Sequence, residues 1–158
     1  MVTWNVIKIA AAVGAGTAGG VFFAFSTFVM RALDRLPPAH SVAAMQAINK
    51  YAPNPLFMAV LFGTAAASAA LIVHGVRSGE SGAGYLITGG VLYLCGIVLT
   101  IVYHVPHNNA LDLVDANGPE AASAWSRYAG PWTAWNHVRT LTSLGAAAAY
   151  SMALLRAG

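Results

Sequence analysis

The sequence predicts an all-α integral membrane protein, folded as a four-helix bundle with short amphipathic helices in its two long connections. Three observations support this prediction. Charged residues make up only 8% of the 158 residues, against roughly 25% in soluble globular domains, and hydrophobic residues make up 58%. The mean hydropathy is +0.63. Four apolar runs reach the length of about 20 residues that a helix needs to cross a bilayer.

This composition excludes several classes of protein. Eight basic and five acidic side chains cannot cover the surface of a water-soluble domain, which excludes an ordinary cytosolic enzyme. The high hydrophobicity excludes a disordered chain. The basic residues are scattered rather than clustered, so we expect no nucleic-acid partner. The single cysteine, Cys95, excludes an intramolecular disulfide, and the length predicts one domain over residues 1–158.

The first predicted span covers residues 9–30, where no charge lies between Lys8 and Arg31. Its apolar core is longer than the roughly 7–15 residues of a signal peptide, so we interpret it as a retained span. Small residues recur at every fourth position, and we expect this ladder to let a neighbouring helix approach closely. The ladder consists of Ala12, Gly16, Gly20 and Ala24.

The second and third predicted spans cover residues 56–76 and 83–103. Only a polar hexapeptide, RSGESG at residues 77–82, joins them, so we expect these two helices to be antiparallel neighbours. The fourth predicted span covers residues 132–155 and differs from the others because it contains a charge, Arg139.

The two remaining connections are long. In the first, residues 31–55, a Pro-Pro pair is expected to end the preceding helix, and residues 41–49 follow the pattern of a short amphipathic helix. In the second, residues 104–131, Trp125 and Tyr128 are spaced one helical turn apart. We expect both connections to lie at the membrane surface or to cap the bundle.

Most of the chain consists of Ala, Gly, Leu and Val, so two polar segments stand out. Residues 104–109 follow the third span, and residues 132–140 begin the fourth. The third helix ends on the side where the fourth begins, so we expect these segments to meet at one mouth of the bundle. Five residues of the fourth span share one helical face: Trp132, Asn136, Arg139, Thr140 and Ser143.

The charge inside the fourth span is the strongest functional signal, because an ionisable residue at membrane depth indicates a functional site by default. The guanidinium of Arg139 can hold an oxyanion, a carbonyl or a phenolate. Asn136 can donate and accept hydrogen bonds, and histidines can transfer protons near neutral pH. The candidate catalytic residues are therefore His104, His107, Asn136, His137 and Arg139.

Two alternatives for these residues remain open. Arg139 can instead pair with Asp112 or Asp115 and fasten a loop. Three of the histidines could also bind a zinc, copper or iron ion, although Pro106 prevents a regular helical pair of ligands. The metal-ligand candidates are His104, His107 and His137.

Five short segments occur in an order that is typical of one family. The sequence reads GGVFFAFS at residues 19–26, AMQAIN at 44–49 and NPLF at 54–57. The most specific segments are Val-Pro-x-Asn-Asn at 105–109 and Trp-Asn-His-Val-Arg-Thr at 135–140. Over nearly its whole length the chain resembles the anthrone oxygenase family, which consists of small membrane proteins of bacteria and fungi.

This resemblance implies an activity. Members of the family oxidise anthrones to anthraquinones with O2, without an evident flavin, haem or metal. A base removes a proton from the acidic methylene of the anthrone, and the resulting anthrolate reacts with O2. The resemblance implies that one of His104, His107 and His137 is the base, and that Arg139 and Asn136 stabilise the oxyanion and the peroxide.

The resemblance also implies roles in substrate binding. Trp132 and Trp135 would stack on the flat substrate, and Asn108 and Asn109 would orient it. As a structural alternative, the two tryptophans form an aromatic belt at the membrane surface and the two asparagines cap the third helix. The sequence departs from the family pattern at His104, a position where Asn is usual.

The sequence leaves open whether the chain is catalytic. It favours an oxidoreductase without a cofactor that acts with O2 on a lipophilic, anthrone-like or quinol-like substrate. The alternatives are a non-enzymatic tetraspan accessory or lipid-binding protein and a metal-dependent membrane oxygenase. We expect an integral protein of a bacterial cytoplasmic membrane that contacts membrane lipids and could form a homo-oligomer or join a larger complex.

Overall fold

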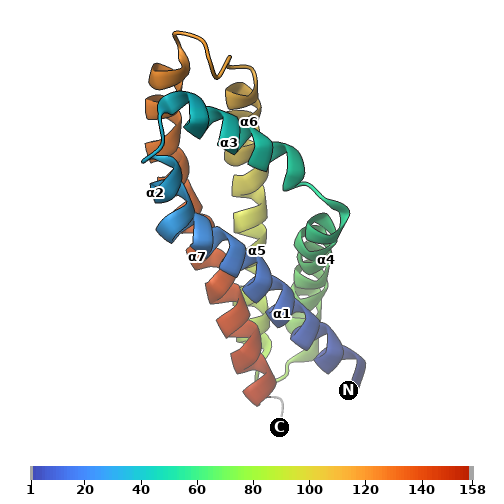
Figure 1. The fold of residues 1–158 in the computed structure, drawn as a ribbon. Helices are drawn as coiled ribbons and strands as arrows, with labels where there is room; N and C mark the ends of the chain where they lie inside the picture. The colour runs from blue at the N-terminus through green and yellow to red at the C-terminus, as the bar shows by residue number, and fades with distance from the viewer. Residues whose placement is uncertain (1, 157–158) are drawn as a thin grey trace.

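The computed structural model describes residues 2–156, and these residues form helices and no strand, as predicted (Figure 1). Two segments, η1 and η2, have the wider turn of a π-helix and continue α1 into α2 and α5 into α6. The elements are α1 (Val2–Ala24), η1 (Phe25–Val29), α2 (Met30–Leu33), α3 (Pro38–Tyr51), α4 (Pro55–Ser78), α5 (Ala83–Leu99), η2 (Thr100–His104), α6 (Val105–Asp112) and α7 (Ala121–Arg156).

Four long helices lie alongside one another. Helix α1 packs against α4 and α7, and α5 packs against the same two helices. Both ends of the chain lie at one end of the molecule, while α3 and α6 lie at the opposite end (Figure 1). Helices α4 and α5 are packed neighbours joined by a short turn, which agrees with the antiparallel pair predicted from the hexapeptide.

Three helical stretches of the described residues are long and apolar enough to cross a membrane, namely Thr3–Leu33, Pro55–Ser78 and Ala83–Asp112. They contain the first three predicted spans and indicate an integral membrane protein. Large apolar side chains are also exposed on the outside of the molecule, as expected of surfaces that face lipid. Examples are Val13, Phe28, Phe62, Val98, Val102 and Leu141.

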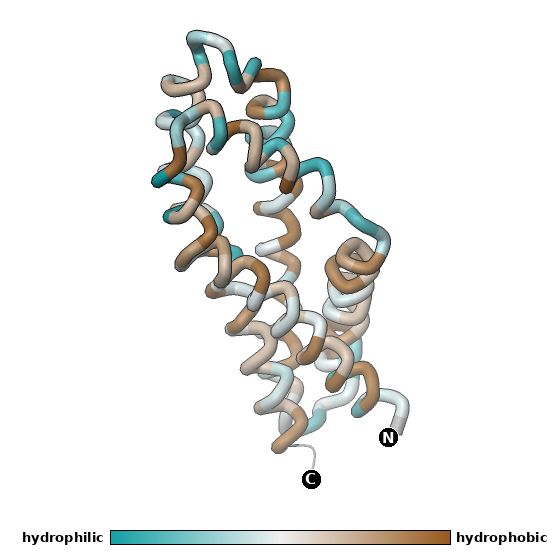
Figure 2. Tube along the Cα trace, viewed as in Figure 1, coloured by the Kyte–Doolittle hydropathy of each residue, from teal (hydrophilic) through white to brown (hydrophobic). Residues whose placement is uncertain are grey.

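The hydrophilic residues gather where the spans end. Figure 2 shows them concentrated around α3 and the connections, whereas the long helices are mostly hydrophobic. The predicted fourth span lies within α7, which is less apolar than the other long helices because polar residues interrupt it.

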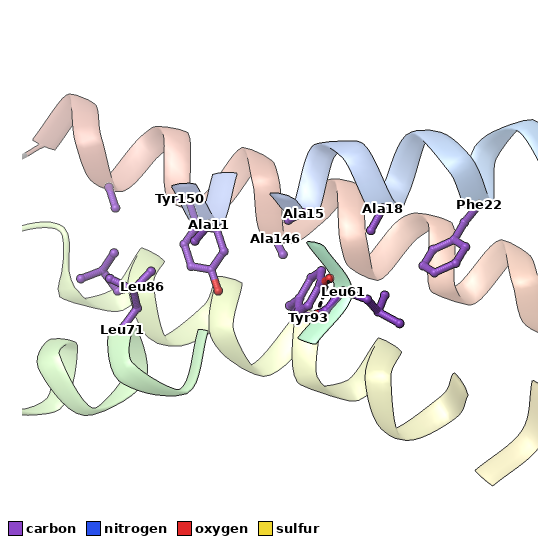
Figure 3. Packing of buried hydrophobic residues seen from close by; sticks show 11 residues of the cluster. Ala11, Ala15, Ala18, Phe22, Leu61, Leu71, Leu86, Tyr93, Ala146 and Tyr150 are labelled. Atoms are coloured by element: carbon purple, nitrogen blue, oxygen red, sulfur yellow. Dashed lines mark hydrogen bonds between the residues drawn. The ribbon is translucent and has the colours of Figure 1, made fainter. Parts of the chain in front are cut away.

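Buried side chains of the four long helices form the main core (Figure 3). The predicted ladder on α1 was wrong at Gly20, which is exposed and where a Cβ would meet no atom of the described residues within 4 Å. The closest approaches of α1 use two other glycines. A Cβ at Gly14 would clash with Thr64 on α4, and a Cβ at Gly19 would lie 2.8 Å from Cδ2 of Leu144 on α7. The buried face of α1 carries Ala11, Ala15, Ala18 and Phe22.

The two long connections differ in how well they were predicted. Helix α3 confirms the short helix expected over residues 41–49. The second connection is much shorter than predicted, because the chain stays helical to Asp112 and α7 begins at Ala121. Pro106 does not break the helix, which continues from α5 through η2 into α6, and the proline stands just after the wider turn of η2.

An ion pair joins α1 to the α4–α5 turn at the end of the molecule where the chain termini lie. Nζ of Lys8 lies 2.8 Å from Oε1 of Glu80 in the α4–α5 turn, and the lysine side chain is almost fully buried. Nε2 of His74 lies 3.6 Å from the other carboxylate oxygen, and the Trp4 ring stacks on the His74 ring at 3.9 Å. These contacts fasten the start of α1 to α4 and to the turn that follows it.

Candidate functional site

Two π-helical segments flank the polar part of α7. Segment η1 carries the buried Ser26, and η2 carries Thr100 and the buried His104. π-Helical turns are rare, cost helix stability and occur most often at functional sites. Both segments place polar side chains next to the same turns of α7, so the cluster around those turns is the candidate site.

Arg139 is at the centre of this cluster, and its side chain is only 6% exposed. Its Nη2 donates to Oδ1 of Asn136 at 2.6 Å, and its Nη1 donates to Oγ1 of Thr100 at 3.4 Å. The guanidinium carbon also lies 4.2 Å from the centre of the Phe22 ring and 5.4 Å from that of Trp132. The charge is therefore held between aromatic faces, which attract a cation.

Asn136 fixes the position of the arginine. Its Nδ2 donates to the carbonyl oxygen of Phe22 and to Oγ of Ser26, both at 2.8 Å, so its Oδ1 faces Arg139. Oγ of Ser26 lies 3.0 Å from Oγ1 of Thr140, which donates to the carbonyl oxygen of Asn136. This network joins η1 to α7 and provides hydrogen-bond partners for the side-chain amide of Asn136, which is fully buried.

No carboxylate in residues 2–156 forms an ion pair with Arg139, and its Nε has no hydrogen-bond partner there. The predicted pairing with Asp112 or Asp115 was wrong. Asp112 accepts a hydrogen bond from Asn49, and Asp115 accepts one from the backbone of Asn117. A buried charge without a carboxylate is costly, and this cost points to a ligand that carries or develops negative charge.

His104 is the second buried polar group with free hydrogen-bonding capacity. Its ring is 1% exposed, and neither ring nitrogen has a hydrogen-bond partner among the described residues. Its ring meets that of Trp132 edge-on, with centroids 5.2 Å apart, and that of Tyr103 in the same way at 5.3 Å. Trp132 therefore contacts both His104 and Arg139.

Asn108 holds Trp132 in place. Its Oδ1 accepts hydrogen bonds from Nε1 of Trp132 and from the hydroxyl of Tyr128, each at 2.8 Å. Burial raises the pKa of the Tyr128 hydroxyl above its ordinary value, so the hydroxyl remains a donor at neutral pH. Because both bonds occupy the Asn108 oxygen, its contribution to the site is to orient Trp132.

We expect Asn108→Leu to lower the free energy of unfolding by about 2 kcal/mol, because it leaves two buried donors without their acceptor. Urea unfolding in detergent micelles measures this change. Asn109→Leu is the matched control, since Asn109 is exposed and the change there should cost less than about 0.5 kcal/mol. Equal effects of the two substitutions would contradict the positioning role.

The other candidates lie on the outside of the molecule. His107 is exposed, its Nδ1 is 2.7 Å from the carbonyl oxygen of Tyr103, and its ring stacks on the Tyr103 ring. His137 is exposed on the far side of α7, and the Trp135 side chain is 45% exposed. Together with the exposed Asn109, these residues do not join the buried cluster.

The three histidines do not form a metal site. Across the described part of the chain, no three His, Cys, Asp or Glu side chains are grouped closely enough to hold a metal ion. The donor set proposed from the sequence therefore does not fit a metal in this fold.

The structure adds residues that the sequence analysis missed. The predicted polar face of α7 is confirmed as buried, including Thr140 and Ser143. Its partners on other helices were not identified, because single serine, threonine and phenylalanine residues in apolar runs look like ordinary packing residues. Only the rarity of hydroxyl groups in these runs could have suggested them. The missed partners are Phe22, Ser26 and Thr100.

Comparison with known proteins identifies a family. The model of a family described as anthrone oxygenase matches residues 45–149, which is about two thirds of the chain and includes Asn108, Asn136 and Arg139. No curated protein and no solved structure is similar enough to the chain to match it.

Proposed function

The chain belongs to the anthrone oxygenase family, and on this premise we propose that it is a membrane-embedded oxygenase that acts with O2 on a lipophilic aromatic substrate. The substrate is anthrone-like, with a methylene group beside a carbonyl, or quinol-like. The catalytic centre is the buried cluster around Arg139 and His104.

One observation carries this proposal. A buried arginine and a buried histidine flank the same tryptophan. Among the described residues, the arginine has no carboxylate partner and neither ring nitrogen of the histidine has a hydrogen-bond partner. A protein that needed only stability would gain by replacing these groups with apolar ones. Groups of this kind are typical of a site that stabilises charge which develops during a reaction.

Each group has a step that suits its chemistry. His104 accepts a proton from the methylene of the substrate and leaves an anion delocalised onto the carbonyl oxygen. The guanidinium of Arg139 stabilises that oxyanion, and Asn136 keeps the guanidinium in place. His104 is favoured over His107 and His137 as the base because those two side chains are exposed.

The reaction balances with O2 as the only co-substrate. The carbanion carbon reduces O2 and forms a C–O bond, and the peroxide takes up the proton. Loss of the second methylene hydrogen as a proton, with cleavage of the O–O bond, gives the new carbonyl and one molecule of water. The proposed reaction uses neither a metal nor an organic cofactor.

The proposed setting is a bundle that spans the membrane four times. Residues 132–155 of α7 form the fourth span, and the packing of α7 against α1 and α5 supports this assignment. An even number of spans agrees with the two chain ends lying at one end of the molecule (Figure 1). We propose a bacterial cytoplasmic membrane, whose apolar phase concentrates both O2 and a lipophilic substrate.

Turnover in phospholipid nanodiscs tests the proposal. With an anthrone we expect O2 to be consumed and anthraquinone to be formed in equal amounts, above the autoxidation seen with nanodiscs that carry the Arg139→Met variant. Under ¹⁸O2 the new carbonyl should gain one labelled oxygen. A quinol substrate would instead give quinone without the label, so the two substrate classes are distinguished.

If wild type and Arg139→Met oxidise anthrone and hydroquinone at equal rates, the proposal is wrong, and a non-enzymatic tetraspan protein is favoured instead. Elemental analysis of protein purified without chelators tests the absence of a metal cofactor. A metal present in a one-to-one ratio would contradict that part of the proposal.

A further inference from the structure

A second polar site lies outside the buried cluster. A groove of about 530 Å³ runs between the end of the first span, at Met30 and Asp34, and the adjoining face of α7. Its walls carry three ionisable side chains, Arg31, Asp34 and His137. The groove falls within the roughly 300–1,000 Å³ of small-molecule sites, and the proposed oxygenase reaction uses none of these side chains.

The arginine of this groove is free to bind a ligand. Within residues 2–156, Arg31 forms no ion pair with a carboxylate, although Asp34 lines the same groove. Asp34 accepts a hydrogen bond on Oδ1 from Nε1 of Trp125, at 3.0 Å, which holds its carboxylate on the groove wall. The exposed side chains of Arg31 and His137 can therefore turn to the same ligand.

The position of the groove relates it to the membrane. The span-capable stretch of the first helix ends at Leu33, so we expect Arg31 and Asp34 to lie near the depth of the lipid headgroups. On α7 the groove extends from Ser126 to His137, about 16 Å at the helical rise per residue. His137 is an exposed ionisable residue inside the fourth run, and such a residue needs a polar partner within the membrane.

Small residues make room for that partner. The α7 side of the groove includes Ala129, Gly130 and Ala134. A Cβ at Gly130 would meet no atom of the described chain within 4 Å, so the space above it is open. Larger side chains at these positions would fill the groove, whereas the present ones leave room for a headgroup.

We infer that this groove binds one membrane phospholipid by its phosphodiester headgroup. The headgroup lies over the small residues of α7, with its phosphate between Arg31 and His137. The acyl chains continue beyond His137 into the bilayer, because α7 enters the fourth span at residue 132. Arginine supplies a donor fork that suits phosphate oxygens, and the phosphate gives His137 the polar partner that lipid tails cannot provide. This inference is independent of the proposed oxygenase activity.

Native mass spectrometry of delipidated protein in detergent tests the inference, with dioleoylphosphatidylglycerol as the probe. We expect one lipid bound per monomer. Arg31→Ala should weaken binding at least about tenfold, because it removes a charge-assisted hydrogen bond. Gly130→Leu should do the same by filling the groove, without changing any charge. Arg35→Ala is the matched control, since Arg35 is exposed nearby but does not line the groove, and it should bind as wild type does.

Two further probes separate the possible ligands. Dioleoylglycerol, which has the same acyl chains and no phosphate, should bind at least about tenfold more weakly than the phospholipid. Inorganic phosphate at the same concentration should not displace the lipid. Circular dichroism confirms that each variant keeps its helices.

Three outcomes would overturn the inference. The first is lipid binding by both Arg31→Ala and Gly130→Leu at wild-type strength. The second is equal binding of dioleoylglycerol and the phospholipid. The third is lipid bound only to dimers, which would assign the groove to an interface between copies of the chain.

Discussion

Replacing Arg139 with methionine is expected to lower turnover by about 100- to 1,000-fold, which is the effect of losing a preorganised donor for an oxyanion. The free energy of unfolding is expected to change by less than about 3 kcal/mol. Within residues 2–156 the arginine has no carboxylate partner, so its replacement leaves no buried carboxylate unpaired and removes the cost of burying a charge. The opposing costs are the lost hydrogen bonds to Asn136 and Thr100 and the lost contacts with the rings of Phe22 and Trp132, and an unsatisfied buried acceptor costs about 1–3 kcal/mol.

The separation of activity from stability is the diagnostic result. Anthraquinone formation gives the rate, and urea unfolding in detergent gives the stability. Arg139→Lys keeps a positive charge but loses the planar fork that contacts both Asn136 and Thr100, so we expect it to recover little of the rate. Arg127→Met, at an exposed position on the same helix, is the control and should leave both quantities unchanged. A loss of several kcal/mol in Arg139→Met with normal turnover would show that the arginine is structural.

Arg139 could be identified from the sequence because charge is scarce. A single charge within an apolar run must be compensated inside the protein, so its presence alone predicts a polar cluster. The three other spans were predictable for the same reason, since length and apolarity are sufficient to identify a membrane helix. The identity of the compensating groups was not predictable, because they come from residues more than 30 positions away, such as Ser26 and Thr100.

The errors in the fold prediction have local physical causes. The ladder on α1 was assigned from the four-residue spacing alone. Which residues of α1 are buried depends on where the neighbouring helices lie. On the side of α7 it is Gly19 that lies against Leu144. The second connection was expected to begin at residue 104, where the apolar run ends. The helix instead continues through η2 and past Pro106 to Asp112, because a polar sequence can remain helical beyond the apolar stretch.

The sequence did not separate the buried histidine from the exposed ones. Spacing places residues on a helical face but does not tell which face packs against another helix. In the structure the ring of His104 meets Trp132 of α7 and is buried, whereas the ring of His107 stacks on Tyr103 and is exposed. Which histidine is buried depends on where α7 lies, and the local sequence carries no signal for that.

That separation leads to the second large expected effect. His104→Ala should lower the rate of anthrone oxidation by about 100- to 10,000-fold, which is the contribution of a positioned general base. His107→Ala and His137→Ala should change the rate far less, because their rings are exposed outside the cluster. His40→Ala, an exposed histidine on α3, is the control for the loss of any imidazole.

Chemical rescue distinguishes a base from a packing residue. His104 is fully buried against Trp132, so its removal leaves a cavity of the size of an imidazole ring. Added imidazole should enter that cavity and restore part of the rate in His104→Ala, with a dependence on the concentration of its neutral form. Added imidazole should not restore the rate of Arg139→Met, because it cannot replace the planar, positively charged guanidinium group. A His104→Ala variant that folds normally and keeps the wild-type rate would assign the proton transfer to another group.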